Sequence, residues 1–278
     1  MNKRIVTLVA CGALIMCLAG ALCGCNTSQK YEPAMKNAAI TSPSIIENGV
    51  LTVGVSGENA PMSAKGSTGL VGIDVDIAAA IADELGLKLK LVDIDPDPMA
   101  ALNKGTVDIV MGIDKGDATS SVWKSGPYVQ SGVTLFSPTK DAAAPTKGSG
   151  SKIAVQAASL SNWAISSLYE ASEIVAESDL VTAFKDLGDG KANFVAADAV
   201  IGMYAAKAAG ATVFPIAIID APTGYCVGVA DSNSSLKNSI TSALSTLKKD
   251  GVIDTIQKRW LAETIDVATL PAIASSES

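Results

Sequence analysis

The chain has 278 residues, of which 48% are hydrophobic and 18% are charged, and its formal net charge is −7. It contains no histidine, and its only cysteine outside residues 1–25 is Cys226. This composition allows a sizeable core, but it excludes a zinc site and a His-based catalytic triad. The acidic balance also argues against a nucleic-acid partner, because phosphate binding needs a basic surface.

The N-terminus has the three regions of a secretory signal, with a cationic start, an apolar middle over residues 5–22 and a small-residue end. The end, "LCGC" at 22–25, resembles the bacterial lipobox, in which Cys25 is acylated and becomes the mature N-terminus. Residues 1–24 are then a lipoprotein signal peptide. The alternative is a plain membrane anchor with chance cysteines. If the signal is removed, Cys226 has no partner for an intramolecular disulfide.

The polar residues 25–44 contain two prolines and predict a flexible tether. After them, short apolar runs alternate with helical patterns. The helix at 72–86 is the clearest, because Ile73, Ile77, Ile81 and Leu85 recur every four residues and Gly86 ends the pattern. The other elements expected in this half are strands at 51–55, 87–93 and 107–112, a short helix at 97–105, and an extended run at 128–137.

A break rich in Ala, Gly, Ser and Pro at 141–151 precedes a second series of the same kind. We expect strands at 152–156, 173–177, 192–197 and 225–230, an extended run at 211–219, and helices at 159–171, 178–190, 198–210, 234–251 and 252–263. Residues 266–278 read as a loose tail. The alternation of strands and helices predicts an α/β protein.

Several segments, in order and spacing, resemble solute-binding proteins of the polar amino acid ABC-importer family. They are "LTVGVSGENAPM", "GIDVDIAAAIADELG", "MAALNKGTVDIVMG", "SGPYVQSGVTLFS", "KIAVQAAS" and "DLVTAFKDLGDGKANFVAADAVIGMY", and the likeness spans about residues 48–262. It implies a two-lobed α/β fold of the periplasmic-binding-protein type 2, in which each lobe is a sheet flanked by helices and two crossover strands form the hinge. Lobe 1 would comprise 45–137 and 226–265, and lobe 2 would comprise 138–225.

The resemblance also implies a function. The chain would be a monomeric, lipid-anchored component that captures a small amine-containing solute by closing its lobes and delivers it to an ABC permease, without cofactor or catalysis. One alternative is a sensory or adaptor protein on the same fold. Another is a fold-related dehydratase, but its carboxylate-rich substrates would demand basic side chains in the cleft, where this sequence lacks arginine.

In this family an acidic residue of lobe 2 meets the ligand's ammonium group, and the matching position is Asp198; the alternative role is a helix N-cap. Backbone amides of Ala158, Ser159 and Leu160 match a helix start that binds an anionic ligand group, although the family prefers Gly-Thr or Gly-Ser there. Met62 stands where lobe 1 normally supplies an aromatic side chain, and its alternative role is core packing.

The loop "GIDKGDATSSVWKSGPY" at 112–128 departs most from the family pattern. Gly112 keeps the small residue that opens the loop, but the arginine that grips an α-carboxylate would fall at Ala118 or Ser120. Lys115 is the nearest substitute, as a point charge rather than a fork, while Asp114 and Asp117 add negative charge. The remaining family positions of interest, Asp74, Asp76 and Arg259, are expected to be structural.

Overall fold

The structure is a computed structural model that describes residues 36–94, 98–118 and 122–273. The predicted signal peptide and Cys25 lie outside the described residues. No helix within the described ranges is long and apolar enough to cross a membrane.

The first lobe is built on a sheet with the strand order β5-β1-β6-β14-β7, in which β8 also pairs with β14. Its central strands β1 and β6 are parallel and almost fully buried, so their sequences read as continuous apolar runs. Its strands are β1 (Val50–Val55), β5 (Lys88–Asp93), β6 (Ile109–Asp114), β7 (Trp123–Lys124), β8 (Val129–Ser131) and β14 (Thr223–Val229), and a small separate sheet holds β2 (Glu58–Asn59), β3 (Ser63–Gly66) and β4 (Gly69–Val71).

Helices α2 (Ile73–Glu84), α3 (Pro98–Asn103), α7 (Ser234–Lys249) and α8 (Val252–Leu261) pack on this sheet and on one another. In α2 the predicted apolar stripe is confirmed, since Ile73, Ile77 and Ile81 are fully buried. The helix ends as expected at Gly86, whose φ of +67° needs glycine and whose place leaves no room for a Cβ, which would lie 2.5 Å from the Asn37 carbonyl oxygen.

The second lobe is built on a sheet with the order β11-β10-β12-β9-β13. Strands β10, β11 and β12 are parallel, while β9 runs antiparallel between β12 and β13. The strands are β9 (Val133–Ser137), β10 (Ile153–Gln156), β11 (Ile174–Glu177), β12 (Phe194–Asp198) and β13 (Phe214–Ile218), and the helices are α4 (Leu160–Leu168), η2 (Ala171–Glu173), α5 (Leu180–Gly188) and α6 (Ala199–Ala209).

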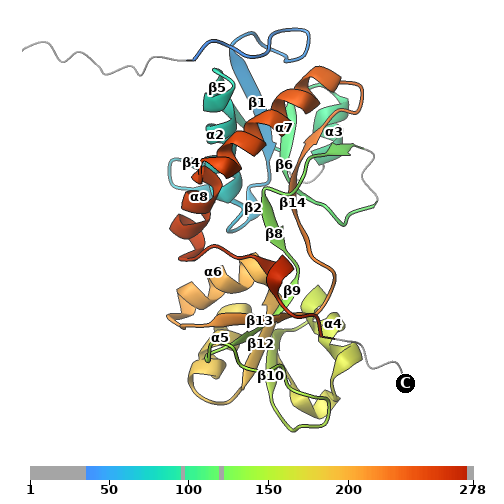
Figure 1. Ribbon diagram of the computed structural model, residues 1–278, viewed down its shortest axis with the longest axis vertical. Coiled ribbons are helices and arrows are strands. Elements are labelled where there is room, and N and C mark those ends of the chain that lie inside the picture. Colours follow the sequence, from blue (N-terminus) through green and yellow to red (C-terminus); the bar gives the residue numbers. More distant parts are fainter. Residues whose placement is uncertain (1–35, 95–97, 119–121, 274–278) are drawn as a thin grey trace, which may run out of the picture. The chain divides into compact units, whose positions relative to one another are not determined.

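The chain crosses between the sheets twice, from β8 to β9 and from β13 back to β14 (Figure 1). The lobe boundaries therefore differ from those predicted. Strand β9 already belongs to lobe 2, so lobe 1 ends near Gly132 rather than at 137, and it resumes at Thr223 rather than at 226. The run 128–137 is extended throughout, and its pattern does not mark where it leaves one sheet for the other.

Two segments predicted to be loose are partly ordered. Within the tether, the Ala39 N–H donates to the Leu85 carbonyl at 2.9 Å, and Ile40 is buried. Within the tail, η3 (Val267–Thr269) forms, and Ala272 makes a β-bridge to Ile218. Both predictions were wrong for the described residues, because single buried apolar residues anchor these segments and leave no periodic pattern in the sequence.

A buried carboxylate fixes the start of lobe 1. The two side-chain oxygens of Asp108 accept hydrogen bonds from the backbone N–H of Ile46 at 2.8 Å and of Thr52 at 2.7 Å. Burial raises the pKa of Asp108, and these two hydrogen bonds oppose the rise. The carboxylate thus ties the segment before β1 to the start of that strand, because Ile46 precedes β1 and Thr52 lies within it.

We expect Asp108→Ala to lower the free energy of unfolding by about 2–4 kcal/mol, because each buried donor left without an acceptor costs about 1–3 kcal/mol. Urea unfolding followed by circular dichroism measures it. The matched control is Asp250→Ala on the exposed surface, for which a change within about 0.5 kcal/mol is expected. Equal effects of the two variants would contradict the anchoring role.

Candidate functional site

The carboxyl ends of the parallel strands in lobe 2 bring two predicted site elements to one edge. Helix α4 follows β10, and α6 follows the adjacent strand β12. In open α/β sheets this edge is where ligands bind. The start of α4 and Asp198, the last residue of β12, therefore lie at neighbouring strand ends.

Asp198 caps helix α6 and reaches toward lobe 1. Its Oδ1 accepts hydrogen bonds from the N–H of Val200 and of Ile201, each at 3.0 Å. Its Oδ2 accepts from the Ser131 hydroxyl at 2.5 Å. Burial raises the pKa of Asp198, and the three hydrogen bonds oppose that rise. The N-cap role is confirmed, and the ligand contact stays a prediction.

The two crossover strands connect Asp198 to a second carboxylate. Ser131 on β8 lies directly opposite Thr223 on β14, so their side chains share one face of the sheet. The Thr223 hydroxyl donates to Oδ1 of Asp114, which ends β6. Asp198 of lobe 2 and Asp114 of lobe 1 thus flank the hinge, and the charge of Asp114 contributes to the raised pKa of Asp198.

Tyr225 joins this group, and the sequence did not predict it. It lies opposite Asp114 on β14, two residues beyond Thr223, so its side chain is on the same face. Burial raises the pKa of the half-buried phenol, and the charges of Asp198, Asp74 and Asp114 raise it further. An aromatic ring beside carboxylates is suited to a cation. The alternation of Thr223 and Tyr225 was the available signal, but the predicted strand began only at Tyr225.

The loop after β6 is held by its own contacts. The Gly112 N–H donates to the Tyr128 hydroxyl at 2.8 Å, and that hydroxyl donates to Oδ1 of Asp74 at 2.6 Å. The N–H of Gly112 is thus used inside lobe 1, and its ligand contact stays a prediction. Lys115 is exposed, and its Nζ donates to the Ser125 carbonyl at 3.2 Å.

Neither predicted arginine position offers a charge. Ala118 is exposed, and Ser120 lies outside the described residues. Arg259 lies in α8, and its guanidinium nitrogen is 3.4 Å from Oδ2 of Asp76. This ion pair supports a structural role for Arg259. Asp74 and Asp76 are structural as expected, although they bond to Tyr128 and Trp260 and neither caps α2.

Met62 is fully buried in the hydrophobic core of lobe 1. Its carbonyl accepts the Asp74 N–H at 2.8 Å, which fixes the segment against the start of α2. The predicted ligand contact is therefore wrong in this structure, and core packing is the observed role. The reason is local: an apolar side chain beside buried Ile73 is more stable inside than on a polar rim.

The start of α4 keeps free donors. The Ser159 hydroxyl accepts the Asn162 N–H at 3.1 Å and donates to the Gln156 carbonyl at 2.7 Å. Ala158 has a φ of +55°, a conformation that explains the family preference for glycine at this position. Within the described part of the chain, no acceptor is bonded to the amides of Ala158, Ser159 or Leu160. These amides remain available to an anionic group.

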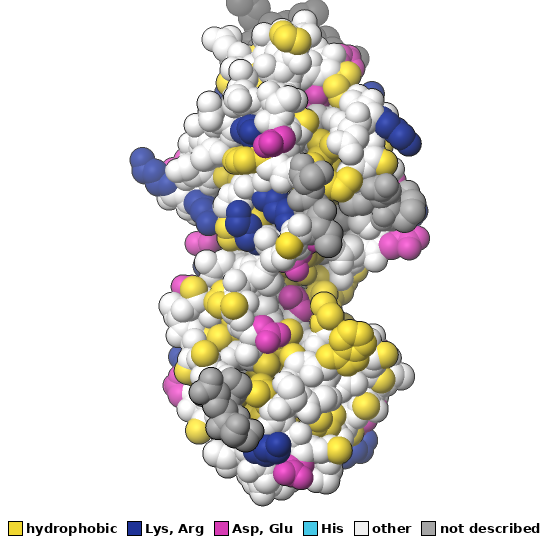
Figure 2. All heavy atoms as spheres, turned by 90° about the vertical axis from the view of Figure 1, so that its right-hand side faces the viewer, with side chains coloured by type: hydrophobic (Ala, Val, Ile, Leu, Met, Phe, Trp, Pro, Cys, Tyr) yellow, Lys and Arg dark blue, Asp and Glu magenta, His cyan; other side chains and the backbone are white. Residues whose placement is uncertain are grey.

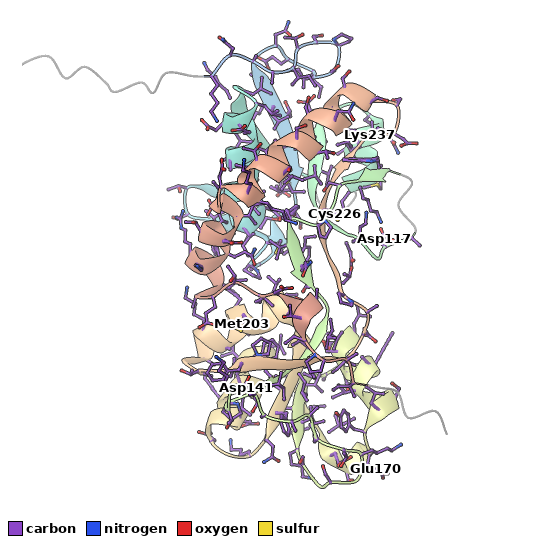
Figure 3. The ribbon with its side chains drawn as sticks, in the orientation of Figure 1. Asp117, Asp141, Glu170, Met203, Cys226 and Lys237 are labelled. Atoms are coloured by element: carbon purple, nitrogen blue, oxygen red, sulfur yellow. The ribbon has the colours of Figure 1, made fainter. Side chains whose placement is uncertain are left out.

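The surface beside this helix start is apolar. The exposed fractions of Leu160 and Trp163 are 76% and 70%, and hydrophobic side chains are visible on the face that carries α4 (Figure 2). In lobe 1, Cys226 is buried on β14 (Figure 3), and burial raises the pKa of its thiol to about 11. In the part of the chain that the structure describes, no group of His, Cys, Asp and Glu residues could hold a metal ion.

The chain forms two α/β lobes joined by two crossover strands, and a helix-capping carboxylate lies at the carboxyl edge of one sheet. This is a periplasmic-binding-protein type 2 fold. The solved structure of a polar amino acid ABC uptake transporter substrate-binding protein from Streptococcus thermophilus shares this fold, with a TM-score of 0.68 at 22% identity over 78% of this chain and 88% of that chain. The chain belongs to the bacterial extracellular solute-binding proteins, family 3, whose model matches residues 51–263.

Two further relatives are similar over most of their length. The L-cystine-binding protein TcyA of Bacillus subtilis (strain 168) is 24% identical over 267 residues, which cover 93% of this chain and 98% of that protein. An ancestral cationic amino acid solute-binding protein is 27% identical, with a TM-score of 0.61 over 77% of this chain and 96% of that chain.

Proposed function

We propose that the chain is the lipid-anchored solute-binding component of an ABC importer, which captures a small amine-containing solute and delivers it to a membrane permease. The solute is an amino acid or a derivative, and closure of the two lobes buries it. The observation that carries the proposal is Asp198, a carboxylate that caps α6 and bonds to the hinge residue Ser131. The two relatives named above support an amino acid-like ligand.

The site favours the ammonium end of the solute. Asp198 and Asp114 flank the hinge, and none of the ion pairs among residues 36–94, 98–118 and 122–273 involves either carboxylate. An ammonium group between them would relieve their mutual repulsion as the lobes close. The free amides at the start of α4 could hold a carboxylate, but without the guanidinium fork that arginine provides.

Isothermal titration calorimetry against a panel tests this proposal. The panel contains L-cystine, L-lysine, L-glutamine, 1,4-diaminobutane and the amine-free control succinate. We expect heat from at least one amine-containing solute and none from succinate. Binding of succinate alone, or of none of the amines, would contradict the proposed class of solute.

We propose that a lipid on Cys25 anchors the protein to the membrane, with the folded lobes on the extracytoplasmic side. Its support is the sequence "LCGC" after an apolar run. Metabolic labelling with a palmitate analogue followed by detergent partitioning measures the lipid. We expect Cys25→Ala to lose the label and Cys23→Ala to keep it, and labelling that survives Cys25→Ala would contradict the assignment.

A further inference from the structure

The C-terminal segment 262–273 connects the two lobes. It begins at α8, which belongs to lobe 1, where Nε1 of Trp260 donates to Oδ2 of Asp76 at 2.8 Å. It ends on the sheet of lobe 2, where Ala272 lies parallel to Ile218 at the end of β13. There the Ile218 N–H donates to the Pro271 carbonyl at 3.0 Å, and the Ile273 N–H donates to the Ile218 carbonyl at 2.9 Å.

The middle of this segment is buried between the lobes. Val267 is fully buried and Ile265 is nearly so, as is Leu261 at the end of α8. They belong to one continuous hydrophobic cluster that also contains Ile77 of lobe 1 and Met203 of lobe 2. Figure 3 marks Met203 on α6, and this side chain lines a cavity together with Leu261 and the segment's first residues, Ala262 and Glu263.

A polar contact also joins helix α6 of lobe 2 to helix α8 of lobe 1. Nζ of Lys207, in the last turn of α6, donates to the carbonyls of Arg259 and Trp260 at 3.2 and 3.3 Å. These carbonyls lie at the C-terminal end of α8, where a cation also stabilises the helix dipole. Helices α6 and α8 are therefore joined across the lobes. The segment then runs from α8 past the crossover strands to the side of α4 (Figure 1), where Pro271 to Ile273 line a pocket together with Leu168 and Tyr169.

We propose that the segment 262–273 is a third connection between the lobes, beside the two crossover strands. Two crossover strands alone permit twisting as well as bending, and a third attachment restrains both motions. The connection also covers the end of the edge strand β13, where it pairs with Ile218. This inference does not rest on the identity of the solute.

A pair of neighbouring proline substitutions tests the connection on the full chain. Ile273→Pro removes the N–H that donates to Ile218, whereas Ala272→Pro removes an N–H that has no acceptor among the described residues. The readouts are hydrogen–deuterium exchange of peptides from α6, β8 and η3, and the number of transitions in scanning calorimetry. Both work without a ligand.

We expect Ile273→Pro to speed amide exchange at least tenfold in η3, β8 and α6, and to split one calorimetric transition into two. Ala272→Pro should leave both readouts near wild type. A chain that ends at Ala272, compared with one that ends at Ile273, removes the same donor without proline, should the substitution prevent folding. If exchange rises only in 267–273 and unfolding stays a single transition, the segment is a local surface tail and the proposal is wrong.

Discussion

Asp198→Asn should weaken solute binding strongly while leaving helix α6 folded. Asparagine caps a helix about as well as aspartate, so the bonds to Val200 and Ile201 can be kept. The charge opposite the ammonium group is lost, and removing one partner of a buried charge pair costs about 2–5 kcal/mol. We therefore expect the Kd of whichever amine binds wild type to rise about 30-fold or more, measured by calorimetry.

Asp179→Asn is the matched control for this prediction. Asp179 caps α5 as Asp198 caps α6, and its carboxylate accepts the Thr182 N–H at 2.9 Å. The control should keep wild-type affinity. Asp198→Ala, in contrast, should lose both binding and about 1 kcal/mol of stability, since it removes the cap as well. Wild-type affinity in Asp198→Asn would leave Asp198 with a capping role alone and remove the main support for the proposed function.

The fold could be predicted from the sequence wherever burial follows a period. The four-residue spacing of Ile73, Ile77 and Ile81 placed α2, and the apolar run 51–55 placed the central strand β1. The boundaries of the lobes could not be predicted in this way. Strands β8 and β9 form one extended run, and which sheet each joins depends on partners more than fifty residues away, such as Thr223 and Val195.

The candidate site likewise contains residues that could be predicted from the sequence and residues that could not. Asp198 was predicted from the family's motif position, and its capping role follows from a local pattern, a carboxylate directly after a strand and before a helix. Tyr225 and Thr223 were missed because their place beside Asp114 follows from antiparallel register, which a single sequence does not display. Gly112 was assigned to the ligand from the resemblance to the family, and its hydrogen bond to Tyr128 could be found only in the structure. Residues whose roles depend on cross-strand partners need the structure.

The buried carboxyl group of Asp74 predicts that the stability of the protein falls as the pH rises toward 7. Asp74 is fully buried, and burial raises its pKa from 3.8 to about 7, although the hydrogen bond from Tyr128 opposes the rise. The folded state therefore binds this proton more tightly than the unfolded state. As pH rises from about 4 to about 7, the unfolded chain gives up the proton first, and the free energy of unfolding falls by roughly 4 kcal/mol.

Asp74→Asn should remove this fall, because an amide stays neutral at every pH and its oxygen can still accept from Tyr128. Urea unfolding of wild type and Asp74→Asn at pH 4, 5, 6, 7 and 8 isolates the contribution of Asp74, since all other titrating groups are common to both proteins. We expect the variant to gain stability relative to wild type as pH rises, with most of the gain below pH 7. Tyr128→Phe should extend the fall to higher pH, because it removes the hydrogen bond that holds down the pKa of Asp74 in the folded state. Parallel pH curves for wild type and Asp74→Asn would show that Asp74 titrates alike in the folded and unfolded states.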